Sequence, residues 1–203
     1  MPRSVAGRRT HDAESIVRIA FSLFRERGYD ATTIDQVAVR AGVTKAAIYH
    51  HVSGKEAILV NGVTRALDAL FAVLEDPRVT APAATPMDQL EQILRAAVEV
   101  EVEHLDEVAV LLRMRGNTSV ESAIMQRRRE FDEAVARIVE EAMRRGEARA
   151  DLDPHIATRL ILGMANSLTE WIRPAGEMSR ERIVDAVVGI ARSGLSAPTE
   201  STS

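Results

Sequence analysis

The chain has 203 residues, of which 46% are hydrophobic, 28% are charged and only 3% are aromatic, a balance typical of a soluble globular protein. It contains no cysteine, which excludes disulfides, thiolate metal sites and cysteine nucleophiles. Its formal net charge of −4 is unevenly distributed, because residues 1–55 hold nine Lys and Arg against five Asp and Glu. A basic N-terminal quarter ahead of an acidic remainder is typical of a DNA-binding head attached to a body that does not bind DNA.

The N-terminal residues predict neither a secretion signal nor a membrane anchor. The sequence MPRSVAGRRTHD lacks the apolar core of a signal peptide, and we find no run of about 18 apolar residues that would span a membrane. These observations predict a cytoplasmic protein with no membrane partner. Residues 1–11 carry Arg3, Arg8 and Arg9, either in a solvated tail or in an arm that reaches phosphates or the minor groove.

Three helices are predicted in the N-terminal quarter. The first runs from Asp12 to Gly28, with apolar residues at helical spacing, a capping aspartate and a terminal glycine. The next two, about Ile34–Arg40 and Thr44–His50, are joined by a tight turn at Gly42, which can adopt the left-handed conformation. The second of this pair exposes small, basic and hydrogen-bonding side chains, a face that can enter the major groove of DNA. Its exposed residues are Thr44, Lys45, Ala46, Tyr49 and His50.

The fourth predicted helix runs from Ser53 to Leu74 and would connect the head to the body. Lys55 lies in its first turn, where a positive charge is unfavourable for the helix macrodipole. A lysine makes sense there if it faces a phosphate that also meets the N-terminal amides of the helix. Residues 76–86 contain three prolines and are predicted to form a loop.

The remaining chain predicts a helical body. Helices are expected over residues 87–104, 108–115, 119–145, 154–172 and 179–194. The second is short and apolar, and the others carry apolar residues along one face, although alternating glutamates blur the period near the end of the first. We find no strand-like alternation, so the predicted fold class is all-α, with about nine helices, three small ones in the head and a larger bundle behind them. The polar residues 196–203 are predicted to be a disordered tail.

A longer pattern around the turn resembles a known family. The pattern TTI..VA..AGVTK.AIYHHV..KE.IL, within about Ile16–Leu59, is similar to the N-terminal helix-turn-helix of the tetracycline-repressor (TetR) family. Val52 departs from it, since the family usually has an aromatic residue there. The resemblance implies a DNA-binding domain over 1–55, a ligand-binding and dimerisation domain over 56–195, and a homodimer through the last two helices. Two heads would then reach successive major grooves of a palindromic operator.

The resemblance also implies roles for the exposed residues of the head. Thr44 and Lys45 are the candidates for base-edge or nearby contacts, and Ala46 lies on the same face. The alternative is an ordinary solvated helix face, but the charge distribution, the turn glycine and the preceding helix together favour DNA binding. Phosphate contacts that set the register are expected from Thr33, Tyr49, His50 and Lys55.

The body is expected to hold a small-molecule effector. The stretch NSLTEWIRPAGEMSRERI, residues 166–183, resembles the signature W-[YI]-R-P-G-G-x-[LM]-S of acyl-CoA-responsive TetR regulators, with Ala175 in place of the first glycine. An acyl-CoA thioester is therefore the lead effector. The alternative is a hydrophobic molecule of drug or natural-product type, sensed by a regulator of an efflux or natural-product gene. The candidate ligand residues, for which surface exposure or plain packing is the alternative, are His104, Arg113, Met114, Arg128, Phe131, Met164, Asn166, Glu170 and Trp171.

The sequence does not indicate catalysis. None of the five histidines has a metal-binding spacing, and we find no nucleophile elbow, P-loop or dinucleotide fingerprint. We therefore expect no metal, no cofactor and no enzymatic activity. The sequence predicts a homodimeric repressor that a small-molecule effector releases from a DNA operator. A small all-α enzyme or carrier, and a DNA-binding protein without an effector, are the alternatives from other classes.

Overall fold

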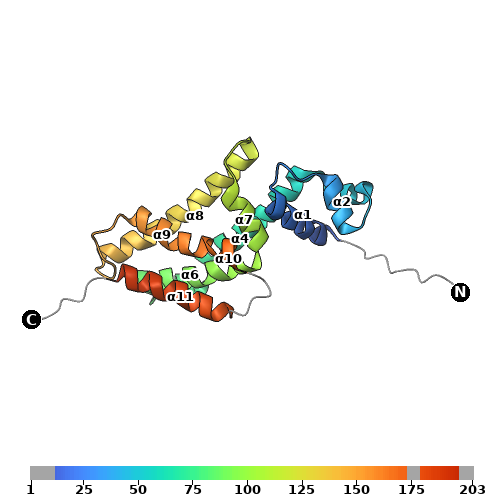
Figure 1. Ribbon diagram of the computed structural model, residues 1–203. Coiled ribbons are helices and arrows are strands. Elements are labelled where there is room, and N and C mark those ends of the chain that lie inside the picture. The colour runs from blue at the N-terminus through green and yellow to red at the C-terminus, as the bar shows by residue number, and fades with distance from the viewer. Residues whose placement is uncertain (1–11, 173–178, 197–203) are drawn as a thin grey trace, which may run out of the picture. The chain divides into compact units, whose positions relative to one another are not determined.

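A computed structural model describes residues 12–172 and 179–196, and these residues are mostly helical (Figure 1). Eleven helices lie within them, and two of these, α5 and α10, have only four residues each. The predicted all-α class is confirmed, and the nine longer helices match the predicted number. The described residues contain no strand, only an isolated bridge between Ala148 and Ser196.

The chain divides into two compact units, which we call the head (residues 1–62) and the body (residues 63–203). The predicted arm at 1–11, nearly all of the predicted tail, and residues 173–178 of the acyl-CoA signature lie outside the described residues. The helix bounds are α1 (Ala13–Arg27), α2 (Ile34–Ala41), α3 (Lys45–His51), α4 (Lys55–Leu74), α5 (Pro77–Thr80), α6 (Pro86–Glu103), α7 (Leu105–Arg113), α8 (Ser119–Arg144), α9 (Pro154–Asn166), α10 (Leu168–Trp171) and α11 (Arg180–Leu195).

Aromatic and aliphatic side chains form the core of the head. α1 begins after Asp12, whose carboxylate accepts a hydrogen bond from the N–H of Ser15 at 2.8 Å, so the predicted cap is confirmed. Phe21 and Phe24 are buried on the inner face of α1, with ring centroids 5.4 Å apart in an edge-to-face arrangement. Ile48 of α3 is also fully buried, and it fixes α3 against this core.

The N-terminal half of α4 approaches α1 so closely that one position requires glycine. A Cβ atom at Gly62 would lie 2.1 Å from Cε2 of Phe21, far inside van der Waals contact. Because Phe21 is itself fully buried, its ring has little free space to move into. Gly62 therefore sets how near α4 lies to α1 within the head.

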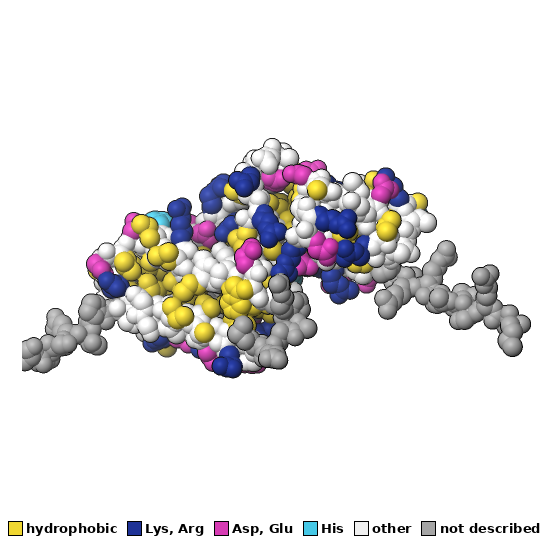
Figure 2. All heavy atoms as spheres, in the orientation of Figure 1, with side chains coloured by type: hydrophobic (Ala, Val, Ile, Leu, Met, Phe, Trp, Pro, Cys, Tyr) yellow, Lys and Arg dark blue, Asp and Glu magenta, His cyan; other side chains and the backbone are white. Residues whose placement is uncertain are grey.

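In the body, α6 is surrounded by other helices, since α8, α9 and α11 all pack against it (Figure 1). Its inner face carries Ile93, Leu94 and Val98, which are at most 1% exposed. α8 and α9 also pack against each other. Hydrophobic side chains remain gathered on the outer surface of the body over α9 and α11 (Figure 2).

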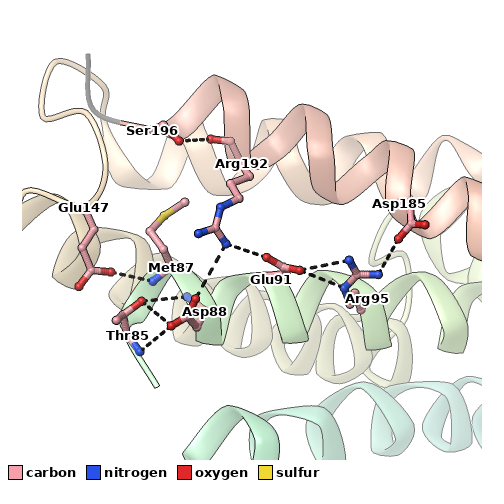
Figure 3. Close-up of polar contacts among 9 residues, drawn as sticks. All are labelled: Thr85, Met87, Asp88, Glu91, Arg95, Glu147, Asp185, Arg192 and Ser196. Atoms are coloured by element: carbon pink, nitrogen blue, oxygen red, sulfur yellow. Dashed lines mark hydrogen bonds and ion pairs between the residues drawn. The ribbon is translucent and has the colours of Figure 1, made fainter. Parts of the chain in front are cut away.

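A row of ion pairs joins α6 to α11 (Figure 3). Arg95 donates to Glu91 on its own helix at 3.2 Å and to Asp185 of α11 at 2.8 Å. Arg192 of α11 donates in turn to Glu91 at 2.7 Å. Because these side chains are partly exposed, the pairs fix the register of α11 on α6 more than they stabilise the fold.

The loop predicted over residues 76–86 contains a short helix, so this prediction is wrong in part. Asp76 caps α5, and its carboxylate accepts a hydrogen bond from the N–H of Arg78 at 2.7 Å. Pro77 occupies the first helical turn, where a proline has no intrahelical donor to lose. The proline therefore starts a helix here rather than preventing one.

The single helix predicted over residues 154–172 is interrupted in the structure. α9 ends at Asn166, and α10 begins at Leu168. Ser167 and Thr169 explain the break, because their hydroxyl groups donate to carbonyl oxygens three residues back, at 2.7 Å and 2.8 Å. Such local bonds compete with the regular bonding of a helix.

Among the described residues, one stretch, Lys55–Thr80, is long and apolar enough to cross a membrane. The stretch is not the uninterrupted apolar run whose absence the sequence analysis noted, because Arg65 and Asp68 interrupt it. Ile58 and Val63 within it are fully buried. Length and composition are weak grounds for a membrane span, since the core helices of globular proteins meet the same criteria.

Candidate nucleic-acid interface and effector cavity

A glycine-centred turn joins α2 to α3, as the sequence predicts. Gly42 has φ 69° and ψ 29°, the left-handed conformation that glycine adopts at little cost. The N–H of Val43 donates to the carbonyl of Ala38 at 3.0 Å and closes the turn. The chain passes directly from α2 into α3, which is the arrangement of a helix-turn-helix.

α3 presents one face to solvent. Thr44 caps it by accepting a hydrogen bond from the N–H of Ala47 at 3.2 Å, and buried Ile48 anchors its inner side. Tyr49 is 50% exposed, although it is a large aromatic residue. The structure therefore brings five of the seven candidate DNA contacts together on one exposed surface: Thr44, Lys45, Ala46, Tyr49 and His50.

Thr33 is an exposed residue at the N-terminus of α2. Its hydroxyl oxygen accepts from the N–H of Gln36 at 3.3 Å, and its own N–H donates to the Gln36 side chain at 2.9 Å. This reciprocal pair is a capping box, which fixes the start of α2. A hydroxyl group that accepts in a cap still has its hydrogen to donate, so Thr33 can contact a phosphate from this position.

Lys45 is paired with an acid within the head. Its Nζ lies 2.9 Å from Oδ2 of Asp35 on α2, and both side chains are at least half exposed. The hydrogen bond to Asp35 raises the pKa of Lys45, so the amine stays charged. Asp35 was not predicted from the sequence, because it lies ten positions away on another helix. A contact between Lys45 and DNA would replace or share this ion pair.

Lys55 has a structural role that the sequence did not predict. Its amine donates to the carbonyl of Tyr29 at 2.9 Å and lies 4.2 Å from the centroid of the Tyr29 ring. These contacts explain a lysine in the first turn of α4 without a phosphate, because the carbonyl oxygen supplies its negative partner. A phosphate contact by Lys55 stays a prediction, and it would compete with this internal bond.

A small cavity lies in the body among α4, α6, α7, α8 and α9. Its volume is about 30 Å³, room for one or two water molecules or one small functional group. Aliphatic side chains form most of its wall, an environment typical of sites for apolar ligands with a few polar groups. The polar side chains in the wall are Glu101, Arg128, Asp132 and Asn166.

Three of the nine candidate ligand residues line this cavity, namely Arg128, Phe131 and Asn166. Two others, Arg113 and Glu170, pair with each other instead, at 3.5 Å. The remaining four candidates, His104, Met114, Met164 and Trp171, do not line the cavity either. A ligand role for these six residues stays a prediction that applies to a larger effector.

Two acids line the cavity, Glu101 fully buried and Asp132 half-buried, and neither was predicted as a ligand residue. Glu101 is 4% exposed, and its Oε2 has no hydrogen-bond partner among the described residues. Burial raises the pKa of Glu101 to about 8, against the opposing effect of Arg128. Burial also raises the pKa of Asp132, opposed by Arg128 and Arg159. Glu101 is therefore mostly protonated at neutral pH.

Helical spacing contains a signal that could have found Glu101. It lies four residues after Ala97 and seven after Leu94, on the stripe of α6 that faces the core. The neighbouring Glu99 and Glu103 lie off this stripe and are exposed. A glutamate at a core position of an amphipathic helix is the pattern that marks a buried acid.

A helix-turn-helix head joined to an all-helical body defines a class of DNA-binding regulators. Residues 16–61 match the family model for bacterial regulatory proteins of the tetR family, and residues 83–195 match that for the tetracyclin repressor-like C-terminal domain. The second match alone covers more than half of the chain. The protein belongs to the TetR family of bacterial transcriptional regulators. This membership confirms the expectation that it is not an enzyme.

Relatives of similar length share the whole architecture. SCO3833, a TetR-family regulator from Streptomyces coelicolor, is 40% identical, with a TM-score of 0.82 and 93% of each chain covered. The transcriptional repressor KstR2 of Mycobacterium tuberculosis is 27% identical over 199 residues, which cover 94% of this chain and 96% of the relative. The structure of AibR in complex with isovaleryl coenzyme A and operator DNA is 25% identical, with a TM-score of 0.72, and the match covers 88% of this chain and 96% of that one.

Proposed function

We propose that the protein is a homodimeric transcriptional repressor that leaves a palindromic operator when a small-molecule effector binds its body. The observation that carries this proposal is the exposed face of α3, presented by the Gly42 turn on a TetR-family head. Relatives of this chain, KstR2 among them, are named transcriptional repressors. A bacterial protein that acts on chromosomal DNA works in the cytoplasm.

The α3 face would enter the major groove. Lys45 lies in the first turn of α3, where its amine can donate to O6 or N7 of a guanine. Thr44 and Ala46 flank it at the start of the helix and would approach the neighbouring bases. Phosphate contacts would then set the position of the head on the duplex without reading sequence. We propose Thr33, Tyr49, His50 and Lys55 for these contacts.

A second copy of the chain would cover the apolar surface of α9 and α11. Ile156, Leu160 and Ile190 are 58%, 66% and 62% exposed, and they belong to the two helices on which Figure 2 shows hydrophobic side chains gathered. Gly163 continues the stripe of α9, and nothing lies within 4 Å of the position its Cβ would occupy. The surface can therefore accept a closely approaching helix, as a four-helix interface between identical chains requires.

The cavity of the body is the site we propose for the effector. AibR is a relative whose structure contains isovaleryl coenzyme A and operator DNA, and KstR2 is described as a ketosteroid transcriptional regulator. AibR supports an acyl-CoA thioester as the lead effector, and KstR2 supports a mainly apolar one. A cavity of about 30 Å³ admits only the end of such a molecule, so binding would displace side chains of the wall. The alternative effector is another hydrophobic small molecule, for a regulator of an efflux or natural-product gene.

α4 would carry the signal, because it begins in the head and ends in the body. Leu67 and Leu70 of α4 line the cavity, so an effector that enlarges the cavity pushes on this helix. Two heads on a palindrome must match the repeat of the duplex, roughly 34–36 Å for sites one turn apart. An effector that favours another spacing releases DNA, by no more than its difference in affinity for the two states.

Operator selection from genomic fragments, followed by fluorescence anisotropy titration, tests this proposal. We expect salt-dependent binding to a palindrome, because phosphate contacts release counterions. Lys45→Ala should weaken operator binding roughly tenfold or more, and Tyr49→Ala should weaken binding to all sequences alike. Arg137→Ala, on the exposed surface of α8, is the matched control and should bind as the wild type does. Equal binding by Lys45→Ala and the control would mean that α3 is not the recognition helix.

A further inference from the structure

The wall of the body cavity holds an acid that the proposed function leaves unexplained. Glu101 of α6 lines this cavity together with Arg128 and Asp132 of α8 and Asn166 of α9. Its Oε2 is buried and has no hydrogen-bond partner within the part of the chain that the structure describes. Leaving a buried polar atom without a partner costs free energy, so such an atom in a cavity wall indicates a partner that enters from outside.

We propose that the part of the cavity beside Glu101 is a subsite for a hydrogen-bond acceptor, in which Glu101 donates through Oε2 to a carbonyl or hydroxyl oxygen of a mainly apolar effector. The inference rests on the proposed function in taking the cavity as the effector site, and it adds the chemical class of the effector. The acyl carbonyl of a thioester is one such acceptor, and a ketone is another.

Glu101 can act as a donor because it is neutral. Burial raises its pKa to about 8, and a carboxyl group kept neutral by an apolar site offers one O–H donor. The charged groups around Glu101 have opposite signs. Arg128 lies close to Asp132, and Arg159 of α9 also attracts the carboxylate of Asp132. α4 and α7 contribute only apolar side chains to the wall. The O–H group of Glu101 is therefore not taken up by any other group of the cavity wall.

The surroundings favour a neutral acceptor over a charged ligand. A cationic group would lose its hydration against leucine side chains and would lie near the guanidinium group of Arg128. An anionic group would lie near Asp132, which already opposes the charge of Arg128. An uncharged oxygen accepts a hydrogen bond from Glu101 without burying any new charge.

The size of the cavity suits the functional end of a ligand. A volume of about 30 Å³ holds a carbonyl group, in a place that one or two water molecules can also occupy. The rest of an apolar effector would extend along the wall, where Leu112, Phe131 and Leu162 must move to admit it. The subsite thus fixes the position of the oxygen, while the aliphatic wall adapts to the chain.

Binding of three eight-carbon probes to the purified full chain tests the proposal. 2-Octanone carries an acceptor oxygen, octylamine a positive charge and octanoate a negative charge. We expect 2-octanone to bind the wild type more tightly than the charged probes at pH 7, as measured by NMR titration. Glu101→Leu removes the donor and should weaken 2-octanone binding about tenfold. Glu101→Gln, whose amide can also donate, should bind it nearly as the wild type does. Melting curves verify that both variants fold.

The pH dependence of binding identifies the donor. The affinity of the wild type for 2-octanone should fall as the pH rises through about 8, where Glu101 loses its proton, and that of Glu101→Gln should stay constant. Tighter binding of octylamine, with an affinity that rises through pH 8, would overturn the proposal in favour of a cation site. Unchanged 2-octanone binding in Glu101→Leu, or no binding of any probe, would overturn it in favour of a cavity that holds only water.

These outcomes are separable from those of the operator experiment. Operator binding by a protein that shows no preference for 2-octanone through Glu101 would refute the subsite and leave the DNA-binding proposal standing. A ketone preference that depends on Glu101, in a protein whose Lys45→Ala variant binds DNA normally, would refute the recognition-helix assignment and leave the subsite standing.

Discussion

One site in the head and one in the body use charged side chains in opposite ways. In the head, Lys45 and Asp35 pair at 2.9 Å on the surface, where water screens their interaction. In the body, Glu101 lies in a cavity wall, and burial keeps it neutral. The exposed pair can be exchanged for contacts with DNA at little cost, whereas the buried acid can gain a hydrogen-bond partner only from a group that enters the cavity. We infer that the head recognises DNA and that the body binds the effector.

The largest effect is expected on the apolar surface of the body. Leu160→Glu should convert the proposed dimer to a monomer, because each copy would bury an unpaired charge at a cost of about 3–5 kcal/mol. Val39→Glu is the control, since Val39 is 81% exposed but belongs to the head, and this variant should stay dimeric. Size-exclusion chromatography with light scattering measures both. A dimeric Leu160→Glu variant would show that the interface lies elsewhere.

Glu101 should make the folded state less stable as the pH rises. Its pKa of about 8 lies above the ordinary value of 4.5, so the folded state binds more protons than the unfolded state between these values. The free energy of unfolding should therefore fall across this window by a few kcal/mol, on the order of 1.4 kcal/mol per pKa unit. Glu101→Gln lacks this dependence and should be the more stable protein at pH 9. If the melting temperatures of the wild type and of Glu101→Gln differ by the same amount at every pH from 5 to 9, Glu101 ionises normally.

A smaller loss is expected where α4 meets α1 in the head. Gly62→Ala places a methyl group against the buried ring of Phe21, and overpacking of this kind costs about 1–3 kcal/mol. Gly194→Ala is the matched control, since its added methyl group meets nothing within 4 Å, and it should be neutral or stabilising by up to about 1 kcal/mol. Urea unfolding of the two variants measures the difference. Equal stabilities would mean that α4 can move away from α1 freely.

The smallest effect is expected at the exposed ion pair. Asp35→Asn removes the partner of Lys45 and a negative charge beside the DNA, so operator affinity should rise about two- to fivefold. Glu133→Gln, an exposed residue of α8 in the body, should leave operator affinity unchanged. A fall in affinity for Asp35→Asn would mean that Asp35 positions Lys45 for its contact instead of competing for it.

The local elements of the head could be predicted from the sequence because they depend on near neighbours. Gly42 and Thr44 determine the turn and the start of α3 through bonds to residues within four positions. The partners of the two lysines could not be predicted in this way. Lys45 meets Asp35 from another helix, and Lys55 meets a carbonyl 26 positions earlier in the chain. Only the folded head brings these groups together.

The same limit applies to the body. Arg128 and Asn166 were predicted as ligand residues by their type, and both line the cavity. Glu101 was missed, although its place on the inner stripe of α6 follows from helical spacing. Trp171 was predicted on a continuous helix, but the break at Ser167 places it on a separate turn outside the cavity wall. The cavity itself depends on five helices, and no spacing within one helix predicts it.

Native mass spectrometry of the protein with its selected operator tests the central claim most directly, because it counts protein copies on the DNA. We predict two copies of the chain on each palindrome, and loss of the complex with either Lys45→Ala or Leu160→Glu. A complex that holds a single copy, or that forms equally well with Lys45→Ala, would contradict the proposal of a dimeric repressor that reads DNA through α3.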